Sequence, residues 1–264
     1  MTYLWNEMEH IIIFLVAFIA SGLTLFAGFG LGTILLPVFT LFFSIDLAIA
    51  MTAIVHLLNN IFKLILLGKY ANLKVVARFG IPAILAAFLG AWVLLRVSTF
   101  PILASYEIAG HEFSIMPVKL TVALLMIFFA LFEIIPNLKK ISLPHKFLPV
   151  GGLLSGFFGG LSGHQGALRS VFLLQCGLSK ESFIGTGVDI ACIIDVSRIF
   201  VYSSRFTAEF TQESVVLLII AILAGFSGAF IGNKLLKKVT LYSVQTLVAV
   251  MLFGIAFGLA LGLF

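Results

Sequence analysis

Charged side chains are scarce in this sequence, and their scarcity excludes a soluble protein. Only 10% of the 264 residues are charged, whereas 61% are hydrophobic, and the mean hydropathy is +1.21. Soluble domains carry about 25% charged residues. The apolar runs have the length of helices and do not alternate residue by residue, which predicts an α-helical membrane bundle and disfavours a β-barrel.

Other absences narrow the function. The chain contains no nucleotide-binding motif and no HExxH-type metal motif, so we expect neither ATP-driven work nor a metalloenzyme, and no cofactor. Glu7 and Glu9 precede the first apolar run, where a cleavable signal would carry lysine or arginine. The two cysteines, Cys176 and Cys192, stand in apolar surroundings as free thiols. The net charge of +5 comes from lysines in short loops, which indicates membrane orientation and not a nucleic-acid partner.

Two of the hydrophobic runs are too long for one ordinary crossing. About twenty residues span a bilayer, but the first and fifth runs reach about thirty. Glycines interrupt both near the middle, at 28–33 (GFGLGT) and at 159–166 (GGLSGHQG). Each is therefore either one broken span or a hairpin that returns to its own side. The runs fall at about 11–43, 46–67, 75–96, 117–136, 147–176, 182–202, 213–233 and 240–263.

The placement of basic residues favours hairpins. If both long runs return and the N-terminus is outside, the basic clusters at 69–78, 139–146 and 234–238 all face the cytoplasm. Single broken spans would divide these clusters between the two sides, against the positive-inside rule. The hairpin arrangement also puts the C-terminus outside.

Similar elements recur in the two halves of the chain. The stretch 50–53 (AMTA) corresponds to 184–187 (IGTG), and 89–92 (LGAW) corresponds to 227–230 (SGAF). Each half then holds one glycine-broken, hairpin-like segment plus three transmembrane helices, so the second copy is inverted. We therefore predict an all-α integral membrane protein with repeats at 1–140 and 141–264, a layout typical of transporters. The alternative is chance similarity between apolar segments.

The second glycine-rich segment, 151–170, has the chemistry of an anion site. An arginine at membrane depth requires a partner or a function, and Arg169 follows a break from which a half-helix could begin near Gln165. Free N–H groups at such a start attract anions. Alternatively, Arg169 extends to a carboxylate or to lipid headgroups. The predicted substrate-binding residues of this segment are Ser162, Gly163, His164, Gln165, Arg169 and Ser170.

Few other charges lie within the hydrophobic runs. Lys63 and Arg198 add positive charge, against Asp189 and Asp195. Asp195 and Arg198 are three residues apart on one helix, which predicts a structural ion pair. Asp189 is protonated, paired with Arg169 or Lys63, or a proton-coupling site.

A regular polar stripe marks the second run. Thr52, His56, Asn59 and Lys63 recur at spacings of four, three and four, so they share one helical face that avoids lipid. The stripe either binds the anion, through His56, Asn59 and Lys63, or joins helices by hydrogen bonds. His56 is a second candidate for proton coupling, since histidine titrates near physiological pH.

The first glycine-rich tip, Gly28 to Thr33, carries no charge. Its glycines serve either close packing or a second set of bare amides that face the anion. On the latter interpretation, Gly30 and Thr33 join the predicted substrate site.

Three stretches carry a family resemblance: 28–37 (GFGLGTILLP), 52–63 (TAIVHLLNNIFK) and 156–170 (GFFGGLSGHQGALRS). They resemble the sulfite exporter TauE/SafE family, also described as toluenesulfonate uptake permeases, over essentially the whole chain. The resemblance implies a multi-pass permease of the bacterial inner membrane for sulfite, organosulfonates or related small sulfur-containing anions. Many members have two very glycine-rich tips, whereas this second tip carries His164 and Gln165, so the resemblance does not fix the substrate.

The leading hypothesis is a secondary transporter of such anions. An anion channel built from the same half-helices is the alternative, and an intramembrane enzyme using Ser162 and His164 lacks an oriented third group. Gly225, Gly228 and Gly232 could pack within the chain or in a homodimer.

Overall fold

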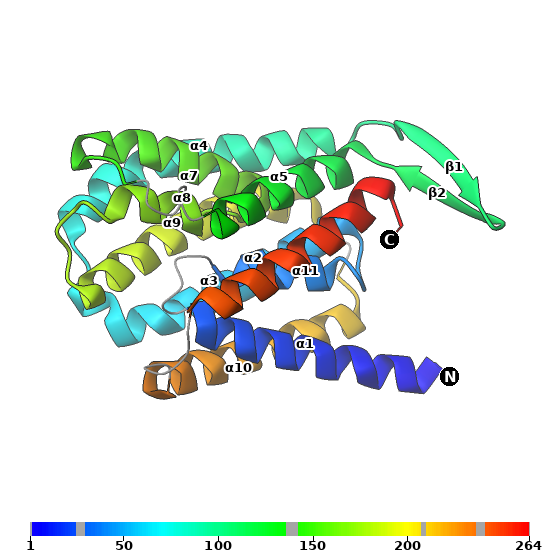
Figure 1. The fold of residues 1–264 in the computed structure, drawn as a ribbon, viewed down its shortest axis with the longest axis horizontal. Helices are drawn as coiled ribbons and strands as arrows, with labels where there is room; N and C mark the ends of the chain where they lie inside the picture. The colour runs from blue at the N-terminus through cyan, green and yellow to red at the C-terminus, as the bar shows by residue number, and fades with distance from the viewer. Residues whose placement is uncertain (1, 25–29, 136–141, 207–209, 236–240, 264) are drawn as a thin grey trace.

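The computed structural model describes residues 2–24, 30–135, 142–206, 210–235 and 241–263, and most of its helices run along one long axis (Figure 1). The α-helices are α1 (Thr2–Thr24), α2 (Leu31–Phe39), α3 (Ile45–Leu67), α4 (Leu73–Val97), α5 (Pro117–Ile134), α7 (Leu148–Ser162), α8 (Gly166–Leu173), α9 (Lys180–Phe206), α10 (Gln212–Leu235) and α11 (Leu241–Leu261). Short 3-10 turns, η1 (Gly68–Tyr70) and η2 (His145–Phe147), precede α4 and α7.

Several of these helices are long and apolar enough to cross a membrane. Within the described residues, three qualify by length and composition: Ile45–Tyr70, Leu73–Val97 and Gln212–Gly232. Shorter apolar helices cover Met8–Thr24, Pro117–Phe132 and Ala249–Leu261. The fold is that of an α-helical, multi-pass membrane protein.

The second broken segment is a hairpin. Gly163 ends α7 in the left-handed conformation with φ of 82°, which glycine adopts without steric cost. After α8, the chain is again beside the start of α7, because Leu143 N–H donates to Val171 O (3.1 Å) and Gln175 Nε2 donates to Ser142 Oγ (2.9 Å). The segment formed by α7 and α8 therefore begins and ends at the same end of the molecule.

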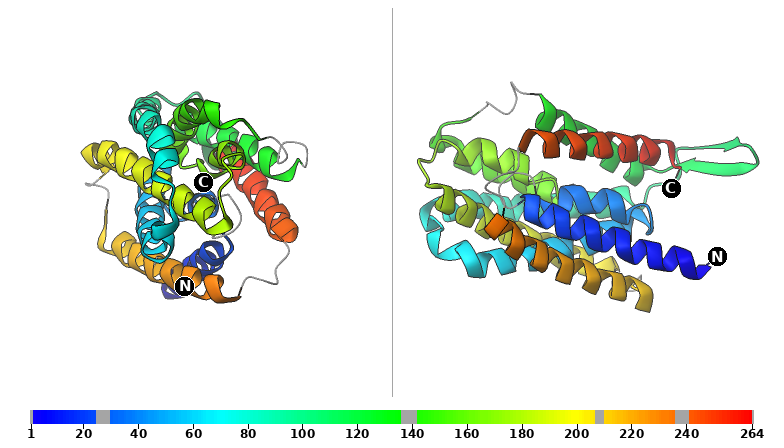
Figure 2. Two further views of the ribbon diagram at one scale, coloured as in Figure 1. Left: turned by 90° about the vertical axis from the view of Figure 1, so that its left-hand side faces the viewer. Right: turned by 60° about the horizontal axis from the view of Figure 1, so that its bottom comes forward.

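The first broken segment places a short, fully enclosed helix inside the bundle. Every residue of α2 is buried, and α2 packs against α1, α3 and α11. Figure 2 shows α2 beside α1, returning toward the end at which α1 starts. The predicted tip residue Gly28 lies outside the described residues, whereas Gly30 is the N-cap of α2.

A two-stranded hairpin interrupts the otherwise helical fold. Strand β1 (Ala104–Ile108) pairs antiparallel with β2 (His111–Ile115), through a turn in which Ala109 and Gly110 have φ of 54° and 81°. Two positive φ values are typical of the tight turns that match strand twist. The expected all-α fold omits this hairpin, because its ten strand residues lie in a connection that the hydrophobic pattern treats as a linker.

The β-hairpin marks one end of the molecule. Both termini lie at this end in Figure 1, and Tyr106 Oη donates to Leu261 O at the end of α11 (2.5 Å). The connections η1 and η2 lie at the opposite end, and so do the start of α9 and the end of α10 (Figure 1).

Glycines allow two helix pairs to approach until their backbones touch. Along α7, Gly152, Gly156 and Gly160 face α4, where an added Cβ would lie 2.1–2.3 Å from carbonyl oxygens. Along α10, Gly228 and Gly232 face α1, where an added Cβ would lie 2.0 Å from Phe18 O and 2.7 Å from Gly22 Cα, respectively. These α10 glycines therefore pack within the chain. Small residues at such spacing are the usual means of close helix packing in membranes.

We expect Gly156→Ala to destabilise the protein. A Cβ at Gly156 would lie 2.3 Å from Ala83 O, and a backbone atom cannot move aside without separating α4 and α7. The steric cost of about 1–3 kcal/mol should exceed the gain in helix propensity of about 1 kcal/mol. The measurement is the thermal unfolding midpoint of the purified protein in detergent.

Gly254→Ala is the matched control. A Cβ at this position of α11 would meet nothing within 4 Å, so its melting temperature should be unchanged or raised. Equal midpoints for the two variants would contradict the backbone contact between α4 and α7.

Candidate functional site

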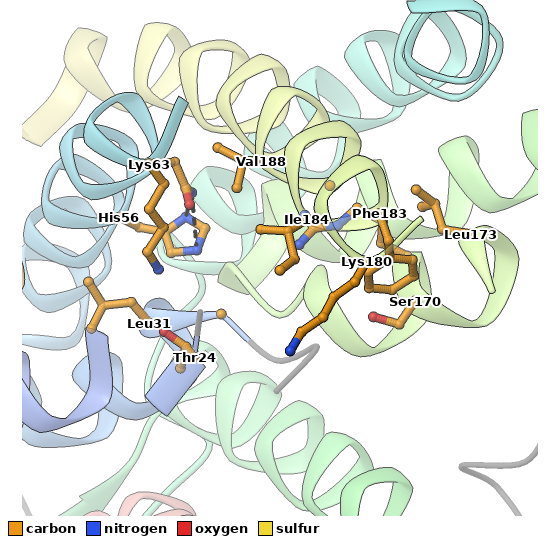
Figure 3. A pocket seen from close by; sticks show the side chains of 14 residues that line it. Thr24, Leu31, His56, Lys63, Ser170, Leu173, Lys180, Phe183, Ile184 and Val188 are labelled. Carbon is orange, nitrogen blue, oxygen red and sulfur yellow. Dashed lines mark hydrogen bonds between the residues drawn. The ribbon is translucent and has the colours of Figure 1, made fainter. Parts of the chain in front are cut away.

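A pocket opens where both broken segments meet α3 and α9. It has a volume of about 110 Å³ and is lined from α3, α8 and α9, with Thr24 of α1 and Gly30 and Leu31 at the start of α2. Figure 3 shows Lys63 and Lys180 reaching into this space from opposite sides.

The pocket is cationic. Lys63, Arg169 and Lys180 line it, and none of the described lining residues is acidic. The three cations lie at different depths: Lys63 is 4% exposed, Arg169 is half-buried and Lys180 is exposed. Positive charge thus extends from the surface into the interior, an arrangement that attracts anions and guides them inward.

Lys63 is held in place by its own helix. The Asn59 side-chain amide is oriented so that its oxygen and its nitrogen both have hydrogen-bond partners. The Asn59 amide oxygen then accepts from Lys63 Nζ (3.1 Å), and the amide nitrogen donates to Ser21 Oγ of α1 (2.9 Å). This neutral partner leaves the ammonium charge uncompensated, so it remains available to an anion.

Arg169 is fixed in a similar way. Its Nη1 donates to Gln165 Oε1 one turn earlier (3.3 Å), and Gln165 is the N-cap of α8. Gly187 of α9 lies against the guanidinium, since a Cβ there would be 3.4 Å from Arg169 Nε. The side chain is thereby directed along α9 into the pocket.

Behind the pocket wall, Asp195 collects donors from three elements. Its Oδ2 lies 2.5 Å from His56 Nδ1 and accepts from Asn60 Nδ2 (3.3 Å), both on α3. Its Oδ1 accepts from Gln165 Nε2 (3.2 Å) and from Arg198 Nε (3.0 Å). The expected partner Arg198 also places Nη2 2.8 Å from Oδ1.

Of the predicted binding residues, five lie together at the pocket. Gln165 and Asn59 lie outside its lining but hold Arg169 and Lys63, and Thr33 is buried in the first turn of α2. The pocket is lined by the predicted residues Gly30, His56, Lys63, Arg169 and Ser170.

The turn between α7 and α8 faces a different neighbourhood. His164 Nδ1 lies 3.0 Å from Ser162 Oγ, its ring stacks on Phe129, and a Cβ on Gly163 would lie 2.6 Å from Arg198 Nη1. These residues are outside the pocket lining. The α8 residues that line it are Arg169, Ser170 and Leu173, from the later part of the helix.

Sequence reasoning missed Lys180 and Asn60. Lys180 begins α9 after a short connection. In the sequence it cannot be told apart from the other lysines of the predicted cytoplasmic loops. Asn60 follows Asn59 directly, yet one bonds toward α1 and the other toward α9. The proton-coupling candidate Asp189 is half-buried and lies outside the pocket lining.

Comparison with known protein families identifies a match over nearly the whole chain. A family model described as "Sulfite exporter TauE/SafE" matches residues 13–259, which includes every residue that lines the pocket. The chain belongs to the sulfite exporter TauE/SafE family. A search of curated proteins and a search of solved structures each gave no match. As a TauE/SafE protein, it is a membrane transporter of a family that exports sulfite-type anions.

We expect Asp195→Asn to lower the stability of this TauE/SafE protein. The change removes the charge that compensates Arg198, and breaking a buried ion pair costs about 3–5 kcal/mol. Thermal unfolding in detergent measures the effect. Asp189→Asn is the control, because its half-buried carboxyl makes no side-chain hydrogen bond to the described residues, and it should melt close to the wild type. A wild-type midpoint for Asp195→Asn would contradict this account of the centre.

Proposed function

We propose that this TauE/SafE protein is a secondary transporter of small sulfur-containing anions such as sulfite or organosulfonates, with the cationic pocket as its substrate site. The observation that carries the proposal is the convergence of Lys63, Arg169 and Lys180 on one pocket with no acidic residue among its described lining. A bidentate guanidinium and two ammonium groups suit the oxygens of a sulfite or sulfonate group.

The size of the pocket favours small substrates. A single water needs about 10–15 Å³ on the same measure, so 110 Å³ accommodates a small oxyanion with a few waters. A sulfonate with a large apolar group would need the pocket to widen.

The positive-inside rule orients the protein. The described basic residues at the end that carries η1 and η2 are Lys69, Lys74, Arg78, Lys146, Lys180 and Lys234. This end belongs in the cytoplasm by that rule, with both termini outside, in the bacterial inner membrane. The exposed Lys180 then stands at a cytoplasmic mouth of the pocket.

Helix pairing supports alternating access between two inverted repeats. α1 packs on α10 as α7 packs on α4, while α3 packs on α9 and α5 on α11. Exchanging α1 with α7, α3 with α9, α4 with α10 and α5 with α11 leaves this set of pairs unchanged. An inverted repeat has this property, and rocking of one repeat against the other would expose the pocket to each side in turn.

The membrane potential can supply the energy. With the inside of the cell negative, the export of one negative charge lowers the free energy by about 2.3 kcal/mol per 100 mV of membrane potential. Export therefore needs no coupling ion, whereas uptake does.

We expect sulfite or a small sulfonate to raise the melting temperature of the wild type, and Arg169→Gln to abolish that response. Saturation at a hundredfold excess over Kd stabilises by about 2.7 kcal/mol. The measurement is a thermal-shift screen against sulfite, methanesulfonate, sulfoacetate, taurine, sulfate, thiosulfate and carboxylates.

Lys74→Gln is the control, since Lys74 is exposed at the start of α4 and outside the pocket lining. It should respond as the wild type does. If Arg169→Gln binds as tightly as the wild type, the proposed substrate site is wrong.

Proteoliposomes separate a transporter from an anion channel. A transporter should exchange labelled sulfite against an internal unlabelled pool and slow when Lys63 or Arg169 is replaced by glutamine. Large sulfite currents without counterflow would instead establish a channel.

A further inference from the structure

We propose that His56 and Asp195 form a proton-carrying pair, in which His56 takes up a proton when an anion enters the pocket and gives it up when the anion leaves. The inference rests on the proposed function, because the pocket must bind an anion. It concerns what accompanies that anion through the cycle.

The geometry puts the imidazole between the pocket and a carboxylate. His56 lines the pocket and is 3% exposed, whereas Asp195 is 0% exposed and is not among the lining residues. His56 Nδ1 lies 2.5 Å from Asp195 Oδ2. An ionised carboxylate can only accept, so Nδ1 carries hydrogen in both states of the ring. The second ring nitrogen, Nε2, is then the atom that gains or loses a proton.

The surroundings of Asp195 keep its charge. Besides His56, the carboxylate accepts from Asn60, Gln165 and Arg198. Hydrogen bonds and a nearby cation favour the ionised form of a carboxyl group. A proton taken up from the pocket therefore binds to Nε2 of the imidazole, and the Asp195 carboxylate stabilises the resulting imidazolium.

Gly30 lies against Nε2. A Cβ at Gly30 would be 2.7 Å from His56 Nε2, so only glycine leaves this nitrogen its present position. The requirement for glycine in the first tip is thus tied to the atom that titrates.

The charged groups that face His56 determine whether its protonation is favoured or opposed. Lys63 from its own helix and Arg169 and Lys180 across the pocket all oppose a further positive charge. From α9, Arg198 opposes it as well, and Asp195 favours it. The described residues of α1 and α2 that line the pocket are not ionisable, and the described ionisable residues of α10, Glu213 and Lys234, stand near its ends.

An anion between Lys63 and Arg169 cancels part of the opposing charge, so anion binding and protonation of His56 favour each other. Affinity for the anion should therefore rise as the pH falls, because a lower pH favours the protonated imidazole.

The proton changes the charge balance of transport. On binding, one proton from solvent forms an N–H bond at Nε2, and on release that bond breaks and the proton returns to solvent on the other side. A monoanion accompanied by a proton crosses without net charge, whereas a dianion carries one net negative charge. Proton coupling would thus remove the electrical penalty on uptake of a monoanion.

The test measures protons taken up per anion bound. Full-length protein in detergent is titrated calorimetrically with methanesulfonate, which does not titrate in this pH range, and with sulfite. Each titration is run near pH 7 in two buffers that differ in ionisation enthalpy, so that the difference in heat gives the proton count. With methanesulfonate, we expect the wild type to take up a substantial part of one proton per anion bound. With sulfite, we expect the wild type to take up more protons per anion than His56→Gln does.

Matched variants isolate the residue. His56→Gln keeps a donor for Asp195 but cannot carry a proton, so its own uptake should vanish and only the protonation of sulfite itself should remain. His145→Gln changes an exposed histidine outside the pocket and should keep wild-type uptake. The wild type alone supplies a further readout, because its affinity for methanesulfonate or for fully deprotonated sulfite should increase at lower pH.

Four results would overturn the inference. Equal proton uptake in the wild type and His56→Gln would show that His56 does not carry the proton. If Asp189→Asn loses proton uptake and His56→Gln keeps it, Asp189 is the coupling residue instead. A wild-type affinity that does not change with pH excludes the linkage. If the wild type binds neither anion, the proposed substrate site itself fails, and the inference fails with it.

Discussion

The ionised carboxylate of Asp195 is the interaction around which the interior is arranged. It accepts hydrogen bonds from α3, from the start of α8 and from its own helix α9, and so ties the second broken segment to both central helices. In lipid or in a dry interior, such a charge persists only where donors surround it. Because Asp195 balances Arg198, it is not needed to balance the positive charges of Lys63 and Arg169 in the pocket. Anion binding in the proposed substrate pocket would therefore depend on the ion pair between Asp195 and Arg198, which lies outside the pocket lining.

Close backbone packing sets the frame in which this centre operates. The glycine faces of α7 on α4 and of α10 on α1 bring helices together without interdigitating side chains. Each contact joins a broken segment of one proposed repeat to a full-length helix of the other. Few side chains interlock at these contacts, so rocking of one proposed repeat against the other would take place along the glycine faces.

Much of this arrangement can be anticipated from the sequence, and the rest depends on tertiary distances. The break at Gly163, the polar face that includes His56 and Lys63, and the local pair of Asp195 with Arg198 all follow from spacing along one element. The contact between His56 and Asp195 joins positions 139 residues apart, for which one sequence carries no signal. The turn from Ser162 to Gln165 is predicted at the anion because a helix start attracts anions, and this role stays a prediction, since these residues lie outside the pocket lining. The structure places the pocket beside α8, where the direction of a short helix relative to α9 decides which side chains line it.

The enclosure of α2 has a consequence for how the protein enters the membrane. At about 1.5 Å per residue, its nine residues cover less than half of a hydrocarbon core about 30 Å thick. It is covered on all sides by protein and includes Pro37. A segment that neither spans the bilayer nor faces lipid gains little from partitioning on its own. Its final position therefore requires α3 and α11, which the ribosome makes later, so α2 can assume its place only after α11 has been synthesised.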